Sequence, residues 1–113
     1  MSEHLEPTAF ERAVARFNAS EAGNIVTGLT RTLGAPRASV GAAAGARHEV
    51  RVTVDWELSW YQWGVVVGDE SQPVSEINKG GEISQLDAAA KQWNATVDAD
   101  GRLRMVGEPT ARR

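Results

Sequence analysis

Two stretches near the start of the chain space their apolar residues as amphipathic helices do. In the first, Thr8 and Glu11 have the spacing of a capping box, and apolar residues follow at i, i+3, i+4 and i+7. In the second, Ser20 can cap a helix with an apolar residue at every fourth position, which Gly34 and Pro36 end. The two apolar faces are Phe10, Ala13, Val14 and Phe17, and then Ile25, Leu29 and Leu33. We predict two helices, each buried along the face that these residues form.

The middle of the chain alternates between apolar and polar residues, as a half-buried strand does. Over residues 49–58 the apolar positions are even-numbered, whereas over residues 61–67 they are odd-numbered. A strand cannot change parity without a turn or a bulge, and no Gly, Pro or Asn separates the two runs to favour a tight hairpin. We therefore expect a bulge or an abrupt bend near residues 58–60, which leaves two strands or one long kinked strand.

Three tryptophans and a tyrosine lie in this middle region. Each such ring buries about 150–250 Å², which is a large contribution in a domain stabilised by only about 5–15 kcal/mol. We therefore expect Trp56 and Trp63 in the core. Trp60 lies where the parity changes, so its ring could either join the core or face outward, where it could contact a ligand or a partner.

The remaining segments are shorter. Residues 38–47 are ambiguous, since Val40 could begin a strand before a glycine-containing turn. Residues 68–73 have the composition of a loop, and residues 74–78 can form a further short strand.

The last third of the chain contains two more local signals. A second capping-box pattern, Ser84–Asp87, opens a short helix over residues 88–93. The Asp-Gly pair at 100–101 favours a hairpin with arms at residues 95–97 and 102–106. The same segment begins like a calcium-binding loop, but the position that needs a glutamate is Pro109, so we expect a plain turn.

Together these elements predict an α+β fold. It comprises two N-terminal helices, an antiparallel sheet of three to five strands, one short helix and a C-terminal hairpin. A chain of 113 residues has the length of one domain. We place that domain at residues 8–106, between a disordered N-terminus at 1–7 and a disordered, arginine-containing tail at 107–113.

Composition narrows the function classes. The chain has no cysteine, which excludes disulfides, thiolate metal sites and cysteine nucleophiles. It has ten arginines but two lysines, and many alanines and glycines, which is typical of a GC-rich bacterial genome. Neither a signal peptide nor an apolar run of membrane-spanning length is present, so we expect a cytoplasmic protein with no membrane association.

A DNA-binding alternative rests on residues 25–40, which resemble a helix-turn-helix unit. Its recognition helix would span residues 37–47 and would present Arg37 and Arg47 to DNA. Gly41 and Gly45 weaken that helix. Residues 48–101 also contain ten carboxylates against three basic side chains, so nucleic acid is a poor partner for this region.

No pattern indicates catalysis or a metal. Asp55 and Glu57 share one face of a strand and could serve acid–base chemistry if one were desolvated, but we expect a solvated face. His4 and His48 have no ligand or catalytic partner in a suitable position. We expect no cofactor, and we lean against an enzyme.

The leading hypothesis is a non-catalytic protein-binding module, such as a small bacterial cytoplasmic adaptor, chaperone-like or regulatory protein. It would bind another protein or a second copy of itself through its sheet and aromatic cluster. The candidate binding residues are Trp60, Tyr61, Trp63, Asp55 and Glu57. The alternatives are a small-molecule-binding domain, whose pocket Trp60 and Trp63 would line, and the helix-turn-helix regulator.

Overall fold

The structure is a computed structural model that describes residues 7–42, 49–67, 71 and 74–106. The termini at 1–6 and 107–113, which we predicted to be disordered, lie outside the described residues. The elements are α1 (Pro7–Ala19), α2 (Glu21–Leu33), β1 (Arg37–Ala42), β2 (Glu49–Asp55), β3 (Trp60–Val66), β4 (Ser75–Gly80), the 3-10 helices η1 (Ile83–Gln85) and η2 (Ala88–Lys91), β5 (Ala95–Val97) and β6 (Leu103–Met105).

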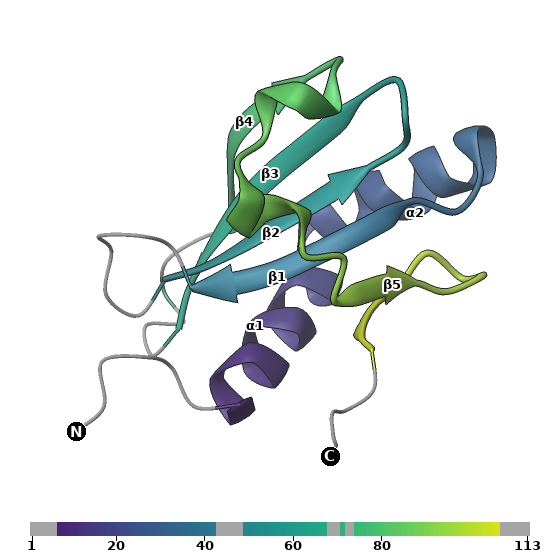
Figure 1. Ribbon diagram of the computed structural model, residues 1–113. Coiled ribbons are helices and arrows are strands. Elements are labelled where there is room, and N and C mark those ends of the chain that lie inside the picture. The colour runs from purple at the N-terminus through teal and green to yellow at the C-terminus, as the bar shows by residue number, and fades with distance from the viewer. Residues whose placement is uncertain (1–6, 43–48, 68–70, 72–73, 107–113) are drawn as a thin grey trace.

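The strands form one antiparallel sheet of six strands in the order β4-β3-β2-β1-β5-β6. Figure 1 shows α1 and α2 against one side of this sheet and the green segment that follows β4 against the other. We call that segment, residues 81–94, the cover segment. The α+β class is confirmed, but the sheet has six strands rather than three to five.

The side of the sheet that faces the helices contains the main core. The predicted alternation is confirmed, because the even-numbered valines of β2 and the odd-numbered residues of β3 point to this side. The aromatic rings meet there: Phe17 of α1 contacts Trp63 edge-on at 5.1 Å between ring centroids. Tyr61 stacks on Trp63 at 5.6 Å, and Trp56 packs edge-on against Tyr61. Trp56 and Trp63 are buried, as predicted.

The spacing of apolar residues predicted the buried face of α1 better than that of α2. In α1, Ala13, Val14 and Phe17 are buried as expected. In α2 the buried residues are Ala22, Gly23 and Val26. Of the predicted face, Leu29 packs half-buried against the core, but Ile25 and Leu33 are exposed, so the prediction is wrong at these two positions. At Gly23 a residue without a side chain takes the inner position because α2 lies close to the end of α1. A side chain at Gly23 would collide with the carbonyl groups of α1 residues 17 and 18.

β2 and β3 are joined by the tight turn that their sequence disfavoured. The backbone N–H of Trp56 donates to the carbonyl of Ser59 at 2.8 Å, and Glu57 takes a positive φ of 78°. Asp55 supports this conformation, because its Oδ1 accepts the backbone N–H of Glu57 at 3.2 Å. Leu58, which the alternation placed on the apolar face, lies at the tip of the turn and is 83% exposed.

Two ambiguous segments are resolved. Residues 37–42 form β1, so the predicted recognition helix is wrong there, and Arg47 lies outside the described residues. The expected short helix at 88–93 is the 3-10 helix η2 over residues 88–91, which Asp87 caps, and a further 3-10 helix, η1, precedes it. The C-terminal hairpin is confirmed as β5 and β6, with Gly101 at a φ of 83° in the turn.

Candidate functional site

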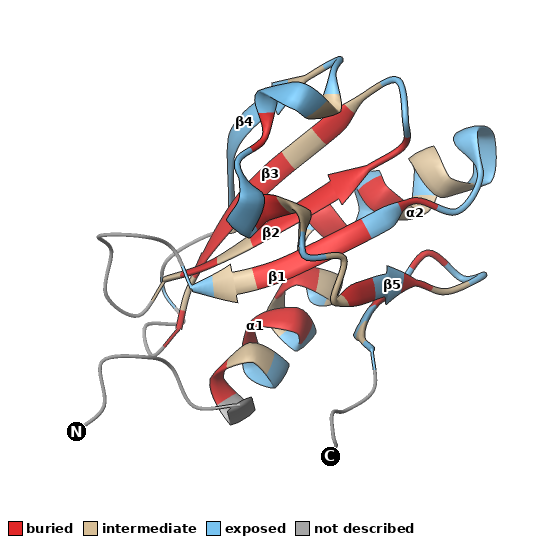
Figure 2. Cartoon of the chain, in the orientation of Figure 1, coloured by how far each residue is buried: buried red, intermediate tan, exposed pale blue. Residues whose placement is uncertain are grey.

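The side of the sheet away from the helices, which we call the polar face, is organised in three rows across β1, β2 and β3. The strand register sets these rows, because directly opposed residues point to the same side. The rows are Arg37–Asp55–Trp60, Ser39–Thr53–Gln62 and Gly41–Arg51–Gly64. Figure 2 shows that the centre of these strands is buried even though one of their sides is polar.

The first row contains the buried carboxylate of Asp55, which pairs with Arg37. Asp55 is 2% exposed, and its Oδ2 lies 3.1 Å from Nη2 of Arg37. The Arg37 guanidinium also lies 4.2 Å from the centre of the Trp93 ring in the cover segment. The predicted solvated strand face is therefore wrong at this position: Asp55 supports the turn and pairs with Arg37, which contacts the cover segment.

The second row attaches the cover segment to the sheet. Gln62 Nε2 donates to the hydroxyl of Thr53 at 3.0 Å, and both residues are buried. The hydroxyl of Ser39 accepts the backbone N–H of Trp93 at 2.8 Å. Next to it, Asn94 pairs with both the N–H and the carbonyl of Val40, each at 2.8 Å. These paired buried groups fix the end of the cover segment on β1.

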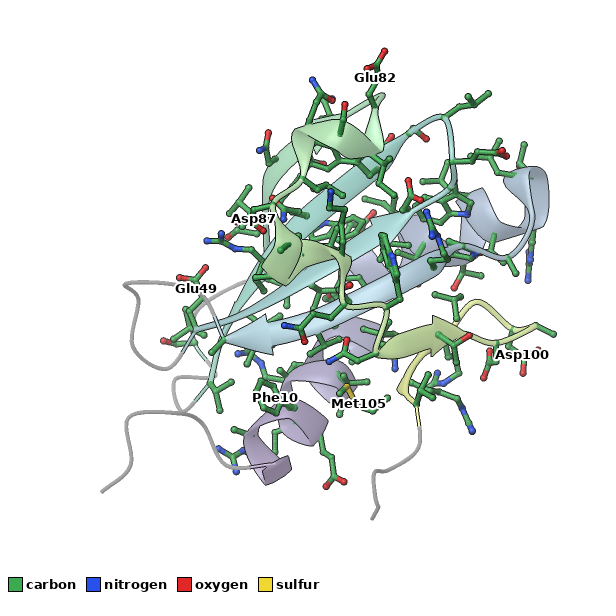
Figure 3. The ribbon with its side chains drawn as sticks, in the orientation of Figure 1. Phe10, Glu49, Glu82, Asp87, Asp100 and Met105 are labelled. Atoms are coloured by element: carbon green, nitrogen blue, oxygen red, sulfur yellow. The ribbon has the colours of Figure 1, made fainter. Side chains whose placement is uncertain are left out.

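The third row borders a pocket of about 110 Å³ between the polar face and the cover segment. The lining residues are Ser39, Gly41, Ala42, Arg51, Thr53, Asp87, Ala89, Ala90 and Gln92. Arg51 stands between two glycines: the Glu49 side chain occupies the space over Gly64, whereas the space over Gly41 is open toward the pocket. Its Nε is buried and has no hydrogen-bond partner among the described residues. Figure 3 shows Asp87 on the cover segment, which lies in front of the sheet.

A second hollow, of about 250 Å³, lies at the other end of β2. Its lining residues are Leu33, Ala35, Arg37, Asp55, Trp56 and Glu57. It therefore includes two of the predicted binding residues. Asp55 is already paired with Arg37, which leaves Glu57 as the exposed carboxylate of this hollow.

The structure does not bring the five predicted binding residues into one site. Tyr61 and Trp63 point toward the helices, whereas Asp55 and Trp60 point to the polar face, and Glu57 lies in the turn. Trp60 does not face outward: it is 2% exposed and its Nε1 donates to the carbonyl of Glu82 at 2.8 Å.

Trp60 instead belongs to a second, smaller hydrophobic cluster beneath the cover segment. It packs there with Leu86 and Ala90, apart from the cluster that contains Trp63. No tryptophan lines the pocket beside Arg51, so a pocket formed by Trp60 and Trp63 is not observed in the described part of the chain.

The residues that border the pocket were not identified from the sequence. Arg51 stands in an alternating strand pattern that is typical of an ordinary exposed position, and Gly41 resembles a turn residue. Only the register places Gly41 and Gly64 on either side of Arg51, and only the path of the cover segment brings Asp87 over them.

Comparisons with protein families, curated proteins and solved structures find no match for this chain. Among the described residues, no three His, Asp or Glu side chains are grouped as metal ligands. His4 and His48 lie outside those residues. Within the same ranges, neither helix is long and apolar enough to cross a membrane.

Proposed function

We propose that the protein is a non-catalytic protein-binding module that pairs its edge strand β4 with a strand of a partner. The observation that supports this proposal is the exposure of β4: five of its six residues are exposed at the end of the sheet. No described strand pairs with its outer side. An edge strand presents backbone N–H and C=O groups that can pair with another chain. The opposite edge, β6, has three residues and offers a shorter template.

The side chains of β4 favour a second copy of the chain as the partner. The register between β3 and β4 shifts between Gln62 and Trp63, so that Glu76 lies opposite Trp63 and Lys79 opposite Tyr61. Because Tyr61 and Trp63 share one side of the sheet, Glu76 and Lys79 share it too.

An antiparallel pairing centred between Ile77 and Asn78 then places Glu76 of each copy opposite Lys79 of the other. Opposite charges in directly opposed positions stabilise strand pairs, whereas like charges destabilise them. Ile77, which is 42% exposed, lies at the centre of this contact. The bulge and the lysine also discourage pairing with unrelated strands, which makes the edge selective. This self-pairing is consistent with a small adaptor or regulatory protein.

The test is a charge-reversal cycle measured by sedimentation equilibrium. We expect the wild-type chain to form a dimer, and Glu76→Lys or Lys79→Glu to weaken it about tenfold, since each replaces attractive contacts with repulsive ones. The double variant Glu76→Lys/Lys79→Glu restores the opposite charges and should restore the dimer. Arg31→Glu, an exposed charge reversal on α2, serves as the control and should have no effect.

Two results would contradict this proposal. One is a monomer at every protein concentration. The other is a dimer that all three β4 variants leave unchanged, which would place the contact elsewhere on the molecule.

A further inference from the structure

The pocket beside Arg51 offers a second binding site that does not involve β4. Its floor is the polar face of β1 and β2, and its roof is η2 with the residues around it. Its volume of about 110 Å³ is somewhat smaller than the roughly 150 Å³ cavity that holds a benzene ring in a protein core. A ligand of a few non-hydrogen atoms would fit there.

Arg51 gives this pocket its chemistry. The buried Nε–H of its guanidinium lacks an acceptor among the described residues. The Glu49 carboxylate lies over Gly64 on one side of Arg51, but on the pocket side Gly41 has no side chain that could accept. A buried donor of this kind is normally satisfied by water or by a ligand. The planar guanidinium matches a carboxylate, which can accept two parallel N–H groups.

The opposite wall limits the charge of the ligand. Asp87 lines the pocket, and its Oδ1 accepts the backbone N–H of Ala90 at 3.0 Å. Its negative charge repels a dianion such as sulfate more strongly than a monoanion. Ala42, Ala89 and Ala90 add apolar surface that suits a short alkyl group.

We infer that this pocket binds a small monocarboxylate, with its carboxylate on Arg51 and its alkyl group against the alanines. Gly41 is part of the site, because a side chain there would occupy the pocket. A Cβ built on Gly41 meets no atom within 4 Å, so the position can accept a larger residue without a collision.

The test is a titration of the isotope-labelled chain with propionate, followed by amide chemical shifts at constant ionic strength. We expect saturable shifts at residues that line the pocket. Propionamide, which has the same shape without the charge, should cause none, and sulfate should bind more weakly. These three probes need no variant, so the result does not depend on whether a substitution folds.

Two substitutions locate the site. Arg51→Met retains the aliphatic length but removes the donors, and should weaken propionate binding at least about tenfold. Gly41→Val should do the same by filling the space. Gly28→Ala is the matched control, since a Cβ there also meets no atom within 4 Å, and it should bind as wild type does.

The inference would be overturned by equal binding of propionamide or sulfate, by the absence of saturable shifts with propionate, or by undiminished binding to Arg51→Met. A tripeptide with a free carboxyl end presents the same chemical group. Its tighter binding than that of propionate would assign the pocket to chain termini and would also overturn the inference. None of these results depends on β4, so they are separate from the test of the proposed function.

Discussion

The two sides of the same sheet are both buried at the centre, but by different means. On the helix-facing side, valines and aromatic rings pack against α1 and α2. On the polar face Asp55, Thr53 and Gln62 are buried, and hydrogen bonds or an ion pair satisfy each of them. The first side is held by apolar area and the second by paired polar groups, so the two sides should respond differently to substitution.

The largest expected effect is on the helix-facing side. Trp63→Ala removes the ring that Phe17 and Tyr61 contact, and should lower the free energy of unfolding by about 3–5 kcal/mol, as measured in urea.

Trp60→Ala is the matched tryptophan on the polar face. Because Trp60 belongs to the smaller cluster, we expect its loss to release the cover segment while the helix-facing core persists. Amide exchange should then accelerate mainly over residues 82–93. If both variants instead unfolded the whole chain alike, the two sides would form one cooperative core.

A smaller effect is expected from the ion pair of the polar face, in which Asp55 is buried and Arg37 is exposed. Asp55→Ala leaves the Arg37 guanidinium and the backbone N–H of Glu57 without their acceptor. The free energy of unfolding should fall by about 1–3 kcal/mol, measured by urea denaturation at neutral pH. Asp100→Ala, at an exposed turn position, is the control and should change stability little. Equal losses for the two variants would show that the burial of Asp55 contributes nothing.

The smallest effect on stability is expected from Asp98, which lies in the turn between β5 and β6. The backbone N–H of Arg102 lowers the pKa of Asp98 below 3.8, with further help from the N–H of Asp100 and the charge of Arg104. A lowered pKa means that this carboxylate stabilises the fold above pH 3.8 and that the contribution is lost as pH falls through the folded-state pKa. The difference in melting temperature between wild type and Asp98→Ala should therefore be small near pH 7 and should shrink below about pH 4. A difference that grows on acidification would contradict this.

Much of the fold follows from local patterns. The face of α1, the alternation of β2 and β3, and the Asp-Gly turn of the last hairpin were each predicted from neighbouring residues. Such features depend on contacts within one element or one hairpin. The spacing of apolar residues along the sequence therefore suffices to predict them.

The errors arise where long-range packing overrides the local pattern. Ile25 and Leu33 are large apolar residues of α2 that stay exposed, yet Gly23 faces inward because the close approach of α1 leaves no space for a side chain. Glu57 adopts a positive φ without being glycine, since Asp55 holds its backbone N–H. Alternation also identifies polar strand residues but not the segment that later covers them, so the burial of Asp55 and the pocket beside Arg51 could not be predicted.

With both sides of the central strands covered, β4 is the longest exposed backbone edge among the described strands, and we expect a second copy of the chain to pair with it. The most direct measurement is the hydrogen exchange of the amides of residues 75–80 at rising protein concentration. We expect the exchange of the outward-pointing amides to slow as the second copy pairs with them, and to stay fast in Glu76→Lys. Exchange rates over β4 that do not depend on protein concentration would contradict the pairing of β4 with a second copy.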